Sequence, residues 1–279
     1  MPTLSEYRER KHWSFSALNQ FFNVCSLQYA FDRIYKLSKA FTPLPLSFGS
    51  AFHRVMEWTA LTRLGGSSPD PAEAAALFQD VWGRQLQEDK DIRFEEDGDA
   101  ETVAAQGRAM CACAAAGIDP EERVVGVSEA FCVPLTCAGG ETLETPLIGE
   151  IDCVVEKGGA RTLVDWKTSG RRWPKDKAAK DWQPTAFVNG YAFKHGLMPD
   201  FRFDVVVKNK TPVLESHDTT RTADDFARLA EYARLAESMI AAEHFFPSEQ
   251  SFYCGGCPHQ EACRNWHRER SRVTLNLAA

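Results

Sequence analysis

Two carboxylates and one ammonium group lie in a pair of short apolar segments joined by a glycine turn. Asp152 lies in PLIGEIDCVVE, and Asp165 and Lys167 lie in ARTLVDWKTS. The Gly-Gly pair between these runs is a hairpin signal. If both runs are strands, Asp165 and Lys167 share a face, because side chains alternate with a period of two. A carboxylate from each strand would converge on one divalent cation, Mg²⁺ or Mn²⁺, able to hold a phosphodiester and activate water.

The surroundings of these acids favour a functional site over a solvated surface. An Asp-x-Lys pattern alone is more typical of an exposed strand face with a weak ion pair. Asp152 and Asp165, however, lie among Ile, Leu and Val residues. An ionised carboxylate in an apolar strand is costly without a partner, and a cation would supply one. Lys167 would orient the water or stabilise charge. Glu150 is also a candidate for this site, although a weaker one, because the period of two places it on the same strand face as Asp152.

The two segments resemble the signature of a known nuclease superfamily. Residues 149–152 (GEID) and 165–167 (DWK) are similar to the PD-(D/E)xK motif, and residues 49–53 (GSAFH) are similar to the Gly-x-x-x-His element of the RecB-like branch. The resemblance implies a metal site formed by His53, Asp152, Asp165 and Trp166. The alternative interpretation is that His53 is a structural histidine on a helix, with a hydrogen bond to its imidazole and no role in metal binding.

A third element of that branch is a Gln-x-x-x-Tyr helix that places DNA near the catalytic lysine. Gln183 fits this pattern, but Phe187 stands where the tyrosine is expected, and Tyr191 follows one helical turn later. Eight residues are slightly more than two turns, so the three side chains would line one side of a helix. The resemblance implies catalytic roles for Gln183 and Tyr191, and the departure puts that of Tyr191 in question.

Four cysteines form a second constellation. Cys254, Cys257 and Cys263 lie near the C-terminus, and Cys25 lies near the N-terminus. Four thiolates can complete one site, which would join the two ends of the chain. The layout resembles the iron-sulfur nucleases related to AddB and to the CRISPR-associated exonucleases, and implies a 4Fe-4S cluster. Spacing alone also suits structural zinc, with His259 or His267 replacing a thiolate.

The remaining cysteines indicate a reducing compartment. Nine cysteines is an odd number for a 279-residue chain without a secretory signal, which argues against a disulfide framework and favours a cytoplasmic protein. The other five are expected to be small buried hydrophobes: Cys111, Cys113, Cys132, Cys137 and Cys153. No apolar stretch approaches the roughly 20 residues that span a bilayer, so no membrane association is expected.

The overall charge argues against non-specific coating of DNA. The net charge is −7 and the isoelectric point is near 5.6, so contacts with DNA would depend on local cations. Two runs could supply them, although each also suits a solvated face: Arg171, Arg172, Lys175, Lys177 and Lys180, and Arg264, Arg268, Arg270 and Arg272. Trp173 and Trp182 interleave the first run and would either stack on unpaired bases or belong to the core.

The order of the elements predicts one α/β domain over residues 1–279, with a restriction-endonuclease-like mixed sheet flanked by helices. A helix from residue 14 or 16 through Tyr29 would carry Cys25, and 41–50 would be an extended connector. Residues 50–118 would form a helical lobe inserted before the sheet, and 122–245 the nuclease core. Residues 14–45 and 246–272 would together form the cysteine module. Strands are expected at 124–135, 146–156, 161–168 and 201–209, and a long helix from residue 224.

These features predict a metal-dependent DNA nuclease. By family analogy it would be an exonuclease on DNA ends or single strands, in repair, recombination or CRISPR-type processing, with a helicase, recombinase or integrase as a possible partner. One alternative is a non-catalytic iron-sulfur DNA-binding subunit of a repair or recombination complex. Another is a redox or structural metalloprotein whose acids are incidental.

Overall fold

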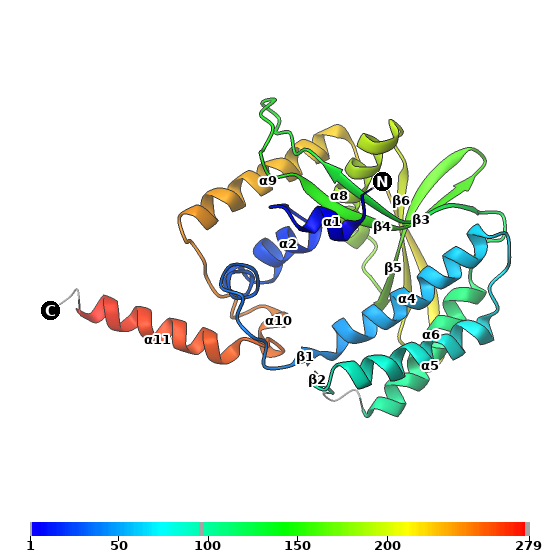
Figure 1. Ribbon diagram of the computed structural model, residues 1–279, viewed down its shortest axis with the longest axis horizontal. Coiled ribbons are helices and arrows are strands. Elements are labelled where there is room, and N and C mark those ends of the chain that lie inside the picture. The colour runs from blue at the N-terminus through cyan, green and yellow to red at the C-terminus, as the bar shows by residue number, and fades with distance from the viewer. Residues whose placement is uncertain (1, 95–97, 277–279) are drawn as a thin grey trace.

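A mixed five-stranded sheet forms the centre of the computed structural model, which describes residues 2–94 and 98–276 (Figure 1). The strands lie in chain order, β3-β4-β5-β6-β7. All neighbours are antiparallel except β5 and β6, which are parallel. The bounds are β3 Arg123–Val133, β4 Leu147–Lys157, β5 Ala160–Ser169, β6 Asp200–Val207 and β7 Val213–Thr219. The predicted hairpin is confirmed, because β4 and β5 pair across the Gly158-Gly159 turn.

Helices cover both faces of the sheet and enclose two separate hydrophobic cores (Figure 1). One face carries the helices that precede the sheet: α4 Leu44–Leu64, α5 Pro71–Glu88 and α6 Ala100–Ala116. The other carries the N-terminal helices together with α8 Gln183–His195 and α9 Ala223–Ala241. A short helix, α7 Lys177–Lys180, precedes α8, and a two-stranded parallel sheet, β1 Thr42–Pro43 and β2 Ile92–Arg93, lies beside α4. The predicted α/β class with helices flanking a mixed sheet is confirmed.

Helix α4 begins earlier than the sequence pattern suggested. The expected extended connector over 41–50 is wrong, because Leu44 is already helical and Pro45 occupies the first turn. Proline fits there, since the first amide groups of a helix have no partner within it. His53 therefore lies well inside a long helix, whose packing against the sheet fixes the position of the imidazole.

The N-terminal segment is not the continuous helix that was expected. Helix α2 (Phe15–Asn19) passes into a π-helical turn, η1 (Gln20–Val24), and after Cys25 helix α3 (Ser26–Tyr29) passes into η2 (Ala30–Ile34). Cys25 interrupts them with extended backbone angles, φ −172° and ψ 119°. It caps α3, because its Sγ accepts the Gln28 amide hydrogen at 3.3 Å. The thiol is thus at a break in the helix and not on its face.

The two ends of the chain pack together. The Ser26 hydroxyl donates to the Phe246 carbonyl at 3.0 Å, and the Phe246 amide donates back at 2.9 Å. His259, nearly inaccessible, lies 2.9 Å from the Asp32 carboxylate. Beyond this junction are α10 Phe252–Gly255 and α11 Gln260–Asn276, and α11 extends away from the body (Figure 1). Among the described helices, none combines the length and apolarity needed to cross a membrane.

Candidate active site

The two predicted metal-binding carboxylates lie where strands β4 and β5 separate. The ladder between them runs from Lys157 and Ala160 to Cys153 and Val164, and ends there. Asp152 and Asp165 are the next residue on each strand. Beyond this point β5 continues along β6, whereas β4 continues along β3. The carboxylates therefore lie at a fork in the sheet, where a ligand can enter between the strands.

Strand β4 also twists at Asp152. Ile151 packs into the core beneath α8, but Cys153, two residues later, packs into the core beneath α4. Opposite this point on β3, Ser128 has a positive φ of 50°, rare for a residue with a side chain. The twist turns Asp152 toward α4, and this explains how a histidine on that helix reaches it.

Each carboxylate has one cationic or titratable neighbour. Asp165 is 1% exposed, and its Oδ2 lies 2.5 Å from Lys167 Nζ. The Gln183 side-chain amide donates to the other oxygen of Asp165. On β4, Asp152 Oδ2 lies 3.1 Å from His53 Nδ1. The structure thus brings together His53, Asp152, Asp165, Lys167 and Gln183, although the sequence separates them by up to 130 positions (from 53 to 183).

Burial and mutual repulsion set the charge states of this group. Burial raises the pKa of Asp165 to about 6, and Asp152 adds to the rise, while Lys167 and His53 oppose it. Burial acts to lower the pKa of His53, but the Asp152 carboxylate outweighs it and the net shift is upward. Burial also acts to lower the pKa of Lys167, and Asp165 and Asp152 reverse that effect. The surroundings of Asp165 therefore disfavour its ionised form.

The donor set fits a hard divalent cation. The Oδ2 atoms of Asp152 and Asp165 are buried, and neither accepts a well-oriented hydrogen bond. A cation held by both Oδ2 atoms would supply the partner that they lack. It would take the place of the His53 proton beside Asp152 and of the Lys167 ammonium beside Asp165. Within the described part of the chain, no three His, Cys, Asp or Glu side chains already converge closely enough to hold an ion. The side chains would therefore have to close around it.

Two of the predicted site residues lie elsewhere. Tyr191 is buried, and its hydroxyl accepts a hydrogen bond from Arg161 at 2.7 Å. Arg161 is four residues before Asp165 on β5, about 13 Å along an extended strand. The structure therefore does not bring Tyr191 to the carboxylates. The indole of Trp166 packs under the lobe helices, on the opposite face from Lys167, which leaves only its backbone carbonyl as a potential ligand.

Close packing of α8 against the sheet holds Gln183 in place. A Cβ atom on Gly190 would lie 2.3 Å from the Phe131 ring, so only glycine permits this approach. Phe187, where the tyrosine was expected, packs edge-on against Phe131 at 5.7 Å and against Phe201 at 6.2 Å. An aromatic core residue thus replaces the polar one.

Glu57 belongs to the site but was not identified from the sequence. It lies one turn after His53 on α4, and its carboxylate accepts a hydrogen bond from the Ser128 hydroxyl at 2.6 Å. Burial raises the pKa of Glu150, and Glu57 and Asp152 add to the rise, so the three acids are neighbours. The sequence feature that could have identified Glu57 is its i, i+4 spacing from His53, which puts both side chains on one face of a helix.

Four cysteines line one cavity of about 410 Å³ between the two ends of the chain: Cys25, Cys254, Cys257 and Cys263. The Gln28 side-chain amide lies 3.5 Å from Cys257 Sγ. Burial raises the pKa of Cys263, and the other three thiols raise it further. His259 also borders the cavity, but its Nε2 faces Asp32. The thiols surround the cavity and do not converge on a single point.

The other five cysteines only partly match the expectation. Cys111, Cys137 and Cys153 are buried as predicted, whereas Cys113 and Cys132 are half-buried. The Cys113 thiol donates to the Pro212 carbonyl at 3.3 Å, so a polar partner compensates for its position.

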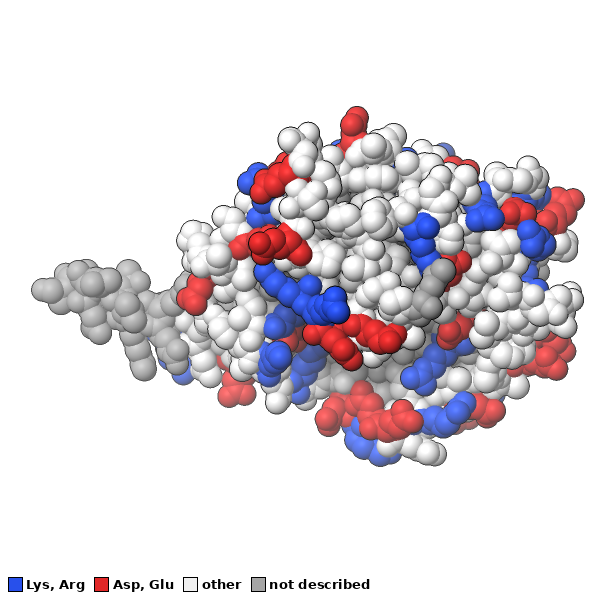
Figure 2. Space-filling model, turned by 45° about the horizontal axis from the view of Figure 1, so that its top comes forward, with Lys and Arg blue, Asp and Glu red and all other residues white. Residues whose placement is uncertain are grey.

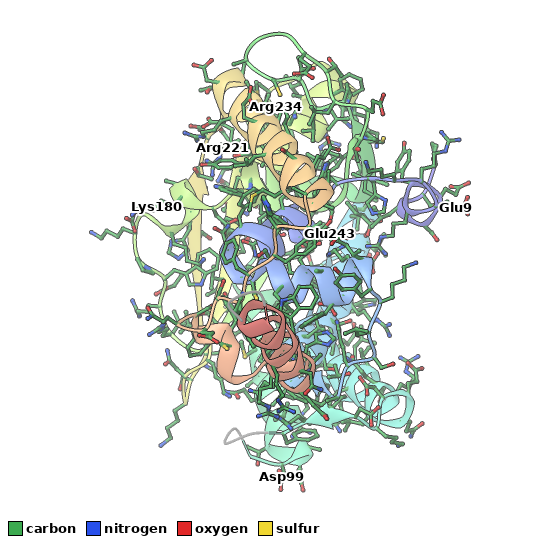
Figure 3. The ribbon with its side chains drawn as sticks, turned by 90° about the vertical axis from the view of Figure 1, so that its left-hand side faces the viewer. Glu9, Asp99, Lys180, Arg221, Arg234 and Glu243 are labelled. Carbon is green, nitrogen blue, oxygen red and sulfur yellow. The ribbon has the colours of Figure 1, made fainter. Side chains whose placement is uncertain are left out.

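The basic run after β5 is largely neutralised by acids. Arg172 pairs with Glu215 at 2.9 Å, Lys177 with Asp181 at 3.7 Å, and Lys180 with Asp176. Figure 3 shows Lys180 directed outward from the body, and on the face in Figure 2 positive and negative side chains alternate. The two tryptophans of this run join the core, since Trp173 packs on Phe203 and Trp182 stacks on Tyr232 at 4.3 Å.

The raised pKa of Asp165 predicts how the free energy of unfolding depends on pH. In EDTA, Asp165→Asn should become progressively more stable than the wild type as pH rises through about 6. The folded-state pKa of Asp165, about 6, is above its ordinary value of 3.8, so its contribution to stability is fully present below pH 4 and is lost as pH rises. Urea unfolding at pH 4, 5, 6 and 7 measures this, with most of the change expected between about pH 4 and 6, and a pH-independent difference between the two proteins would contradict it.

Comparison with known proteins identifies the family. A family model described as the PD-(D/E)XK nuclease superfamily matches residues 12–264. A crystal structure described as a "putative exonuclease" from Eubacterium rectale is 12% identical with a TM-score of 0.52, covering 90% of this chain and 89% of that chain. The structure of SSO0001, also 12% identical, covers 93% of this chain and 91% of that chain with a TM-score of 0.43. No curated protein matches. The chain belongs to the PD-(D/E)XK nuclease superfamily.

Proposed function

We propose that the protein is a Mg²⁺- or Mn²⁺-dependent exonuclease that hydrolyses phosphodiester bonds at DNA ends or in single strands. The observation that carries this proposal is the pair of buried carboxylate oxygens at the fork of β4 and β5, with an ammonium group 2.5 Å from one of them. A structural core has little use for two adjacent acids whose Oδ2 atoms are buried and accept no well-oriented hydrogen bond, since burying such oxygens is costly. Superfamily membership and the fold shared with an exonuclease-named protein support the same reading.

Each residue of the group has a distinct role in this proposal. Asp152 and Asp165 would hold the cation, with His53 as a third ligand. When bound, the cation supplies a Lewis acid for the phosphate and lowers the pKa of a bound water. Gln183 fixes the Asp165 carboxylate by donating to one oxygen, and the other oxygen, which now faces the Lys167 ammonium, would bind the cation. Lys167, with its side chain 30% exposed, donates to the phosphate oxygens as negative charge develops.

We also propose that the four cysteines ligate a 4Fe-4S cluster, as in the RecB-like iron-sulfur branch. Four thiolates around one zinc ion, with Zn–S bonds of about 2.3 Å, would lie close together. The cavity of about 410 Å³ that the four thiols line leaves room for a group larger than a single ion. The cluster would be structural, because hydrolysis transfers no electron. It would tie Cys25, at the break between η1 and α3, to the C-terminal segment.

Degradation of end-labelled DNA tests the nuclease proposal. Anaerobically purified wild type should shorten single-stranded DNA in Mn²⁺ and lose that activity in EDTA, and Asp165→Asn should be inactive in both. Asp224→Asn, an acid at the start of α9, is the matched control and should retain activity. If the wild type is inert while fully loaded with iron and with Mn²⁺ present, the catalytic proposal fails, and a DNA-binding subunit becomes the better description.

A further inference from the structure

An aromatic pair is exposed at the end of the molecule that carries the cysteines. Phe252 is 92% exposed and Tyr253 is 57% exposed, and their ring centroids lie 6.0 Å apart at 77°. Neither ring belongs to a hydrophobic core. A phenyl ring left in water gains none of the free energy of burial. The exposed rings of Phe252 and Tyr253 therefore do not stabilise the fold.

The helix that carries the pair is anchored at both ends. Ser251 caps α10 by accepting the Tyr253 amide hydrogen at 3.3 Å. The side-chain amide of Gln260 donates to the Gly255 carbonyl at 2.6 Å and to that of Cys254 at 3.3 Å. The rings are thus presented from a fixed position, directly before a proposed cluster ligand.

Phe252 borders a cavity that reaches the end of the catalytic strand. The cavity has a volume of about 340 Å³ and lies between the first turns of α4, helix α6 and the residues that directly follow Lys167. Those residues are Thr168, Ser169 and Gly170. Thr168 is three residues beyond Asp165 on β5, so the cavity ends about 10 Å along the β-strand from the carboxylate at the fork.

The lining of this cavity is compatible with a polyanion. Lys208 is among the described lining residues, and no carboxylate is. The Lys208 amide donates to the Ser169 carbonyl at 2.7 Å, which fixes its backbone beside the end of β5. Apart from Lys208 the described lining is neutral and mostly apolar, which suits the bases and sugars of a single strand and does not repel its phosphates.

We propose that Phe252 and Tyr253 form a stacking site for unpaired nucleobases of single-stranded DNA, and position the strand for entry to the Asp152/Asp165 site. This inference rests on the proposed nuclease function. Aromatic side chains stack on any base, so the site would bind single strands without sequence preference. Duplex ends, whose bases are already stacked, would use it only after the strands separate.

Binding of a 5′-fluorescein-labelled oligothymidylate, with Ca²⁺ replacing Mn²⁺, tests the proposal on the full-length protein. Phe252→Ala should raise Kd about 5- to 150-fold, and Phe252→Trp should stay near the wild-type value because it keeps an aromatic face. Phe193→Ala removes a phenylalanine that is 61% exposed on α8 and should leave Kd unchanged. For a strand of equal length containing abasic sites, the difference between wild type and Phe252→Ala should disappear.

Other outcomes overturn the proposal in distinguishable ways. If Phe252→Ala binds both strands like the wild type, or weakens both by the same factor, the ring does not stack on bases. If that variant instead changes the oligomeric state and not the DNA affinity, the pair joins copies of the chain. In these cases Mn²⁺-dependent cleavage by the wild type still upholds the nuclease proposal. If the wild type neither cleaves nor binds DNA, both proposals fail.

Discussion

Lys167→Met should abolish most DNA cleavage while leaving metal binding intact or stronger. We expect a fall in kcat of about 10²- to 10³-fold, the usual effect of removing one preorganised donor from a developing negative charge. Methionine keeps the unbranched shape of the side chain up to Cε, and it removes the positive charge 2.5 Å from Asp165 Oδ2. A cation competing for that oxygen should therefore bind at least as tightly. Single-turnover cleavage and Mn²⁺ titration calorimetry measure the two effects separately.

A matched variant separates this effect from a general loss of positive charge. Lys180→Met removes an exposed lysine whose partner is Asp176, and it should leave both kcat and Mn²⁺ affinity unchanged. If Lys167→Met cleaves at the wild-type rate, the ammonium has no role in the chemistry. If it loses Mn²⁺ binding as well, Lys167 organises the ligands and does not act on the phosphate.

Cys25→Ser should remove the iron and lower the melting temperature by about 10–20 °C. A cross-link between Cys25 and Cys254 closes a loop of about 230 residues, for which chain entropy predicts about 5 kcal/mol of stabilisation. Serine is nearly isosteric but binds iron poorly, so the loss comes from the missing ligand and not from packing. Iron analysis and thermal unfolding of anaerobically purified protein test this expectation.

The control for this prediction is another cysteine of intermediate exposure. Cys132→Ser on β3 lies outside the cysteine cavity and should keep both iron and melting temperature. Zinc in place of iron in the wild type would show that the cluster is assigned wrongly. Unchanged metal content in Cys25→Ser would show that the N-terminal thiol is not a ligand.

The β4–β5 hairpin was predictable because its signals are local. Alternation fixes which side chains share a face, and the Gly-Gly pair fixes the turn, so Asp165 and Lys167 were correctly placed on one face of β5. Gln183 was found through its motif, and the structure brings it to Asp165. These assignments depend on spacing along one strand or one helix.

The errors come from interactions between distant parts of the chain. The break at Cys25 was not predictable from helical periodicity, because it depends on contacts with the segment around Phe246. Tyr191 has the right phase on α8 but lies too far along it, beside Arg161. Glu57 was missed because its role depends on the twist of β4 at Asp152. Strand β7 was missed because its seven residues are mostly polar, and pairing with β6 and contacts of Leu214 and Glu215 with distant parts of the chain stabilise them.

The junction between the chain ends has a consequence for biosynthesis. Ser26 meets its partner Phe246 only 220 positions later, and Asp32 meets His259 after 227. During translation the N-terminal helices therefore emerge with apolar side chains such as Phe21 and Leu27 that lack their final cover. Non-local contacts of this kind slow folding and leave apolar surface open to aggregation. Chaperones that shield nascent helices should thus govern the yield of this protein, and any group held in common by the four thiols could bind only after Cys263 has been synthesised.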